Sequence, residues 1–272
     1  MILKKDIIEY KKNGIIKINS FISNSETSKI IKFIRILFIN FLKKKNITKN
    51  YENLSLEKII LTLKKNFPME YKKIIATTMQ RCPIVLKIGQ SDKVIKTLKR
   101  LNIYNPIFST DPLIMLHSDF VQEKNYAPFH QDWRSIQGSL NNIVIWVPLV
   151  DVKKNMNSIE YIESSHLNGL APTIKDKWFR KIKKIKTTTK DIKSINISKG
   201  DAFIFSSFLI HRSGINTSNF IRVSLQYRYN DLEDSYFINN GYPYPYEYAK
   251  PNDKLIIKKL PSKKQIRKKF KL

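Results

Sequence analysis

The sequence predicts a mainly β fold with flanking helices (α+β), arranged as a jelly roll behind a helical N-terminal part. Two sequence patterns predict this fold. Helical periodicity dominates residues 1–105, and short β-rich runs separated by polar turns follow Asn105-Pro106. The 272 residues are 42% hydrophobic and 11% aromatic, which is typical of a folded chain with a full core. We expect one domain over 1–272, with seven or eight strands forming a sandwich or jelly roll.

The N-terminal part is expected to open with a short strand within residues 7–22, where Gly14 precedes an isoleucine-rich run. Ser23 and Glu26 have the spacing of a capping box, which predicts the start of a helix. Apolar residues keep helical period from Ile30 to Leu42, so one broad face should cover a sheet.

Helical spacing returns between Leu54 and Leu101, interrupted at Phe67-Pro68. Residues 106–230 are expected to form the β core. The predicted strands are Leu113–Val121, Ala127–Trp133, Asn142–Leu149, Ile159–Ile162, Ile192–Ile197, Ala202–Phe205 and Phe220–Tyr229.

Two lysine-rich segments lie outside these strands. Lys175–Lys190 is either a surface loop or a short amphipathic helix, and the pattern does not decide between them. Residues 231–272 form a basic C-terminal extension, of which Lys250–Leu272 is expected to pack partly before it frays.

The formal net charge is +28, but lysine, asparagine and isoleucine are abundant together throughout, as an AT-rich coding bias would produce. A solvated lysine surface is therefore favoured over a specific polyanion site, and no nucleic-acid motif accompanies the charge. The single cysteine, Cys82, excludes an internal disulfide, and no export signal is visible, so we expect a cytoplasmic protein. The apolar stretches are too short or too interrupted to span a membrane.

The candidate active-site residues are few and far apart. In an extended strand His130 and Asp132 would project to one face, and His211 could complete a set of two imidazoles and one carboxylate. This set binds mononuclear iron and leaves three coordination positions open. Arg222 follows within a β-patterned run, and its planar guanidinium matches a carboxylate to which Ser213 could add a hydroxyl.

An isolated His-x-Asp pair is more often a polar strand than a metal site. His117 and His166 are expected to have structural roles and not to bind the metal. We expect His166 to fix its turn by a backbone hydrogen bond. Along Phe220–Tyr229 the even positions are polar and the odd ones apolar, so one face should line the site and the other should meet the helices.

These residues, in this order, resemble the phytanoyl-CoA dioxygenase family of iron(II)- and 2-oxoglutarate-dependent oxygenases over roughly residues 14 to 230. The resemblance rests on five features: His130-Gln131-Asp132-Trp133, the run Ile143–Leu149, the turn Ser164-Ser165-His166, Gly200-Asp201, and His211-Arg212-Ser213 with Arg222. It departs from the family at Asn157-Ser158, where a glycine is usual, and at Glu163-Ser164-Ser165-His166, where the family has Pro-Gly-Ser-His.

The resemblance implies a double-stranded β-helix flanked by helices. It also implies that His130, Asp132 and His211 are the catalytic iron ligands, and that Arg222 and Ser213 hold the C5 carboxylate of 2-oxoglutarate. Trp146 and Met115 would lie beside this cosubstrate. The implied reaction consumes dioxygen and hydroxylates a small organic substrate, with succinate and CO2 as coproducts. Because Asp132 is a carboxylate where related halogenases have a small residue, halogenation is disfavoured.

Two questions stay open. The positive charge favours an anionic substrate, and the alternative function is a repurposed jelly roll that binds nucleic acid or another polyanion. The oligomeric state is not predicted.

Overall fold

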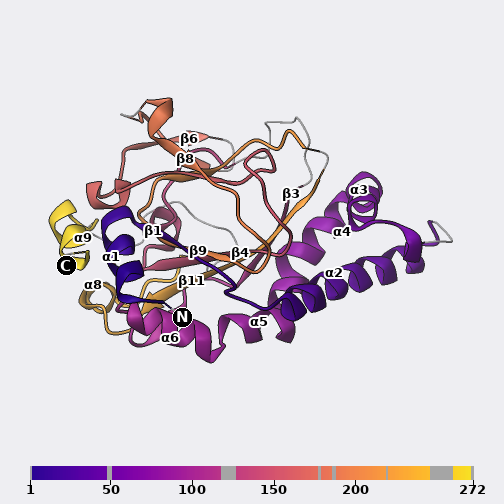
Figure 1. Ribbon diagram of the computed structural model, residues 1–272, viewed down its shortest axis with the longest axis horizontal. Helices are drawn as coiled ribbons and strands as arrows, with labels where there is room; N and C mark the ends of the chain where they lie inside the picture. The colour runs from indigo at the N-terminus through magenta and orange to yellow at the C-terminus, as the bar shows by residue number, and fades with distance from the viewer. Residues whose placement is uncertain are drawn as a thin grey trace.

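The computed structural model describes residues 2–47, 51–117, 127–176, 179–185, 188–218, 220–245 and 260–270. Figure 1 shows two layers of strands one above the other, with helices below the lower layer and beside it. The helices are α1 (Lys4–Asn13), α2 (Asn24–Lys44), α3 (Leu56–Asn66), α4 (Pro68–Lys73), α5 (Pro83–Gly89), α6 (Asp92–Arg100), α7 (Trp133–Ile136), α8 (Ser235–Asn239) and α9 (Lys263–Lys269). The strands are β1 (Ile15–Ile18), β2 (Pro106–Phe108), β3 (Leu113–His117), β4 (Ile143–Pro148), β5 (Ile159–Ile162), β6 (Thr173–Asp176), β7 (Phe179–Ile182), β8 (Ile192–Ser194), β9 (Ala202–Ser206), β10 (His211–Ser213) and β11 (Arg222–Asp231).

The described strands form two antiparallel sheets and a separate two-stranded antiparallel pair. The larger sheet has the order β1-β9-β4-β11-β2, with β3 also paired to β11, and the smaller sheet has the order β10-β5-β8. The pair β6 and β7 stands apart. The predicted mainly β fold with flanking helices is therefore confirmed as a jelly roll, whose described sheets do not close into a barrel.

Alternating residues of the larger sheet enter two separate cores. On β11 the odd positions Val223, Leu225, Tyr227 and Tyr229 belong to the core shared with the helices. Two of these tyrosines fix α5 to the sheet, because their hydroxyls donate to the carbonyls of Val85 at 2.8 Å and Gly89 at 2.7 Å. The opposite face of β4 and β9 fills the space between the two sheets with Val144, Trp146, Phe203 and Phe205.

The helical layer begins as the capping residues predict. The Ser23 hydroxyl accepts from the backbone N–H of Glu26 at 3.2 Å, and the Glu26 carboxylate accepts from the Ser23 N–H at 2.8 Å, which starts α2. The short strand expected within residues 7–22 is β1 (Ile15–Ile18), and the residues before Gly14 form α1 (Lys4–Asn13) instead of extended chain. Gly14 ends α1 in a left-handed conformation, with φ of 78°.

The other differences concern β-rich segments. Lys175–Lys190 is neither a loop nor a helix at its start: β6 and β7 pair antiparallel, and buried Ile182 packs with Phe129 and Ile162. The predicted strand Leu113–Val121 is extended as far as His117, and its remainder lies outside the described residues. The C-terminal extension packs through α9, whose Ile266 is fully buried. No helix among the described residues is long and apolar enough to cross a membrane.

His166 links three parts of the chain and should make stability depend on pH. It is fully buried, its Nε2 lies 3.2 Å from the Lys11 carbonyl of α1, and its ring meets Phe270 edge-on. The predicted backbone contact is therefore present, but it is made to α1 instead of its own turn. Burial lowers the pKa of His166 from 6.5 to about 4.

Between these two pKa values the unfolded chain binds a proton that the folded protein excludes, so the free energy of unfolding should fall as the pH falls from about 6.5 to about 4. Urea unfolding across this range should show a shallower pH slope for His166→Gln than for the wild type. Equal slopes would show that this imidazole is not protected in the folded state.

Candidate active site

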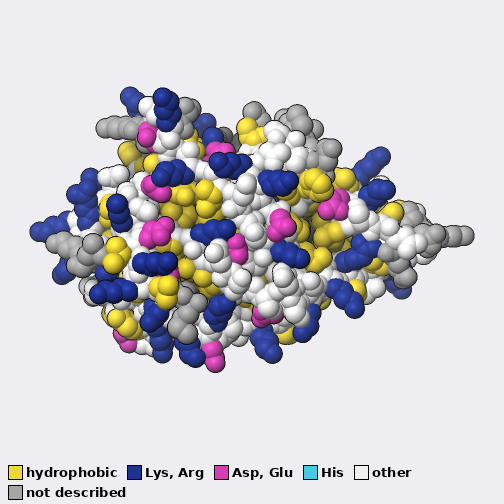
Figure 2. All heavy atoms as spheres, in the orientation of Figure 1, with side chains coloured by type: hydrophobic (Ala, Val, Ile, Leu, Met, Phe, Trp, Pro, Cys, Tyr) yellow, Lys and Arg dark blue, Asp and Glu magenta, His cyan; other side chains and the backbone are white. Residues whose placement is uncertain are grey.

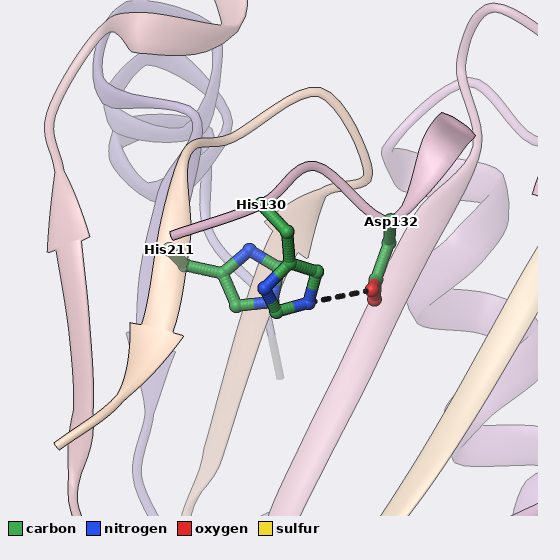
Figure 3. Close-up of side chains that lie close together, drawn as sticks. All are labelled: His130, Asp132 and His211. Atoms are coloured by element: carbon green, nitrogen blue, oxygen red, sulfur yellow. Dashed lines mark ion pairs between the residues drawn. The ribbon is translucent and has the colours of Figure 1, made fainter. Parts of the chain in front are cut away.

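The three predicted ligand residues lie together, as Figure 3 shows. One ligand atom from each of His130, Asp132 and His211 can be chosen so that all lie within 4.8 Å of one another. The His130 Nε2 lies 3.3 Å from an Asp132 carboxylate oxygen, and the centroids of the two imidazole rings are 4.4 Å apart. This is the only such group of metal-binding side chains in the part of the chain that the structure describes.

The ligand pair does not come from a strand, although Ala127–Trp133 was predicted to be one. His130 makes an isolated bridge with His211, with N–H to carbonyl distances of 3.0 and 3.1 Å. The backbone then turns, because Asp132 has helical angles of −61° and −32° and directly precedes the short helix α7. The two side chains still converge, but a turn joined to β10 brings them together.

Hydrogen bonds on the far side of each imidazole orient its metal-binding nitrogen. The Nδ1 of His130 lies 2.7 Å from the carbonyl of Pro128, and the Nδ1 of His211 lies 3.0 Å from the carbonyl of Leu209. A carbonyl oxygen can only accept, so each Nδ1 carries the hydrogen and each Nε2 keeps its lone pair. Backbone contacts of this kind hold histidine ligands at metal sites.

The protonation states of Asp132 and His211 also suit a divalent cation. Burial alone would raise the pKa of the Asp132 carboxyl, but the positive charge of the Arg228 guanidinium holds it well below its usual value. Arg228 Nε donates to one Asp132 oxygen at 3.0 Å and Arg228 also binds the Gln226 side chain. Burial lowers the pKa of His211 to about 4, so its imidazole is neutral near pH 7. A carboxylate and a neutral imidazole are the forms that coordinate metals.

Arg222 and Trp146 meet inside the jelly roll. The Arg222 side chain is only 1% exposed, its guanidinium carbon lies 5.6 Å from the centre of the Trp146 ring, and it donates to the Asn157 carbonyl. Ser224 shares its strand face two residues away, and the buried Ser224 hydroxyl has no hydrogen-bond partner within the described residues. A buried guanidinium beside an unsatisfied hydroxyl fits a carboxylate ligand.

For Ser213 and Met115, the other two residues expected near the cosubstrate, the structure gives strand positions but no side-chain contact with Arg222 or Trp146. Ser213 lies on β10 opposite Ile159, two residues after His211 and therefore on the same strand face. Met115 lies on β3 opposite Ser224 of β11, but its side chain is outside the described residues.

The structure adds site residues that the sequence reasoning did not single out. Arg228 was visible only as one of the polar even positions of the last strand. Gln131 lies between the first two ligands and, in the predicted strand, would project to the face opposite to theirs. Asn157 has a φ of 58° and Ser164 a φ of 59°. These are the two places where the sequence departs from the family's glycines. The left-handed backbone explains why glycine is usual there, and Asn157 and Ser164 adopt the same conformation as non-glycine residues.

The sequence matches one family profile, described as phytanoyl-CoA dioxygenase (PhyH), over residues 10–224. No curated protein sequence is significantly similar to the chain. Among solved structures, the non-heme monooxygenase ThoJ in its apo form has a TM-score of 0.61 and 12% identity, covering 83% of this chain and 77% of that chain.

EctD from S. alaskensis, solved with 2-oxoglutarate and 5-hydroxyectoine, has a TM-score of 0.58 and 13% identity over 86% of this chain and 77% of that chain. EvdO2 from Micromonospora carbonacea var. aurantiaca, complexed with 2-oxoglutarate, has a TM-score of 0.51 and 12% identity over 84% and 91% of the two chains. At such identities the structural similarity establishes the fold alone.

Proposed function

The chain belongs to the phytanoyl-CoA dioxygenase family and is a 2-oxoglutarate-dependent dioxygenase, and we propose that it hydroxylates a small organic molecule at an iron centre held by His130, Asp132 and His211. The observation that carries this proposal is the convergence of these three ligand groups within 4.8 Å. The carbonyls that fix both histidines by Nδ1 support it, because they leave both Nε2 atoms for the metal.

Each residue of the site has a role in the proposal. Arg222 binds the C5 carboxylate of 2-oxoglutarate, the buried Trp146 ring confines it, and Ser213 and Met115 complete the cosubstrate site. When iron(II), 2-oxoglutarate and dioxygen are bound, they supply the oxidation that releases succinate and CO2 and hydroxylates a C–H bond. Arg228 holds one oxygen of Asp132 at 3.0 Å, which leaves the other oxygen to face the metal and His130.

The alternative function, a repurposed module that binds nucleic acid or another polyanion, gains no support from the family match. An anionic substrate and a cytoplasmic location stay predictions. The buried pairing of Asp132 with Arg228 supports a hydroxylase rather than a halogenase, since the carboxylate occupies the place that a halide would need.

Succinate formation tests the function. The purified protein should convert 2-oxoglutarate to succinate in the presence of iron(II), dioxygen and a panel of organic acids, each paired with its neutral ester. Removing iron with a chelator should abolish the product, and adding iron(II) back should restore it. An iron-loaded protein that forms no succinate with any member of the panel would contradict the proposal, and a preference for the esters would contradict the anionic substrate.

A further inference from the structure

The segment that carries His130 and Asp132 is not part of a regular strand. The hydrogen bonds of one side chain take the place of those that a neighbouring strand would make. Gln131 lies between His130 and Asp132 and is 4% exposed. Its amide nitrogen donates to the carbonyl of Gly169 at 2.9 Å and to the carbonyl of Phe208 at 2.7 Å. Its amide oxygen accepts from the N–H of Ala171 at 2.8 Å. Both amide hydrogens are therefore used, and all three partners are main-chain groups.

The contact with Phe208 fixes this segment relative to the third ligand. Three links join it to residues 207–211: His130 to His211, Gln131 to Phe208, and the Trp133 N–H to the Ser207 carbonyl at 2.9 Å. The ring centroids of Trp133 and Phe208 are 5.2 Å apart and the rings stack. This packing adds an apolar contact between the same two segments. A displacement of Gln131 would therefore separate the ligand pair from His211.

The contacts with Gly169 and Ala171 tie the same amide to a second part of the chain. Gly169 ends the short 3-10 helix η5 (Ser165–Asn168) with φ of 75° and ψ of −160°. That conformation is essentially restricted to glycine. The Gly169 carbonyl therefore points to Gln131 because of a backbone conformation that other residues rarely adopt. On the other side of η5, the Ser165 hydroxyl accepts from the Ile210 N–H at 2.9 Å, immediately before His211. The η5 turn thus contacts both ligand-bearing segments.

We propose that Gln131 is a positioning residue that sets the distance of His130 and Asp132 from His211 through its three main-chain hydrogen bonds. This inference rests on the proposed metal site, and it predicts a loss of metal affinity with the fold preserved. Outer-shell hydrogen bonds to metal sites typically contribute ten- to hundredfold in affinity.

The test uses cobalt(II), whose visible absorption reports coordination geometry, in place of iron. Gln131→Glu keeps the side-chain length but removes both amide donors from the two carbonyls. We expect cobalt affinity to fall about ten- to hundredfold and the absorption spectrum to change. Gln80→Glu is the matched control, because Gln80 is also buried, at 8% exposure, but lies in the helical layer. It should retain wild-type affinity and spectrum.

A second variant guards against misfolding. Gln131→Asn keeps the amide and shortens its reach by one methylene, about 1.5 Å, so it should fold and still bind cobalt more weakly. The circular dichroism spectrum and the melting temperature without metal separate folding from affinity. Wild-type affinity and spectrum in Gln131→Asn or in folded Gln131→Glu would overturn the inference. A wild-type protein that binds no cobalt would instead overturn the proposed function.

Discussion

Replacing Asp132 with asparagine should reduce iron-dependent succinate formation by more than about a hundredfold, because a lost ligand should cost more than the ten- to hundredfold typical of an outer-shell partner. The carboxylate is the only anionic group of the proposed trio and also neutralises Arg228 at 3.0 Å. Without it, a divalent ion and a guanidinium would face each other in a buried site with no compensating charge. Iron affinity, measured by titration, should fall together with succinate formation.

Asp201→Asn is the matched control for this experiment. The side chains of Asp132 and Asp201 are both 9% exposed and both are ion-paired, Asp201 with Lys17 at 3.0 Å. Asp201 precedes β9 and is not part of the trio. The control should therefore lose some stability but keep its iron affinity. If Asp132→Asn bound iron as tightly as the wild type, the assignment of this ligand would be wrong.

Replacing Arg222 with lysine should raise the KM for 2-oxoglutarate about ten- to hundredfold while iron affinity stays unchanged. Lysine keeps the positive charge but loses the planar pair of donors that matches a carboxylate, and a hydrogen bond to a charged group contributes about 1.5 to 3 kcal/mol. The buried Arg222 is stacked over Trp146, so lysine would also lose that packing. Initial rates at varied 2-oxoglutarate concentration give the measurement.

The control is Arg212→Lys on β10. Arg212 is ion-paired with Glu160 at 2.6 Å and lies 4.4 Å above the Phe129 ring, and its side chain is 39% exposed. It should leave the KM unchanged. A normal KM in Arg222→Lys would mean that another residue binds the far carboxylate of the cosubstrate.

The sequence predicted correctly those parts of the fold that depend on residues close to one another in the chain. The Ser23–Glu26 capping box is read from neighbours in sequence, and α2 begins there. The alternation on β11 correctly separated the face of Tyr227, which meets α5, from the face of Arg228, which meets Asp132. Ligand spacing and family resemblance together predicted the trio that the structure brings together.

Long-range contacts determine the parts that were missed. Residues 127–133 have the composition of a strand, yet Gln131 bonds to main-chain groups 38 and 77 positions away, and these contacts replace a strand partner. The pairing of β6 and β7 was not predicted, because the segment is rich in lysine and shows no strand pattern. Its buried residue, Ile182, packs against residues from other segments. No periodicity within a segment reveals such contacts.

The two-faced larger sheet also bears on how this protein can diversify. Val147 and Leu225 support the helices, whereas Trp146 and Arg222 on the same strands face the interior between the sheets. Substitutions on the helix side can therefore change the stability of the protein while leaving the side chains between the two sheets in place. A single-residue insertion within one of these strands would turn the residues on one side of it to the opposite face. The strands should therefore tolerate substitution better than a change in length.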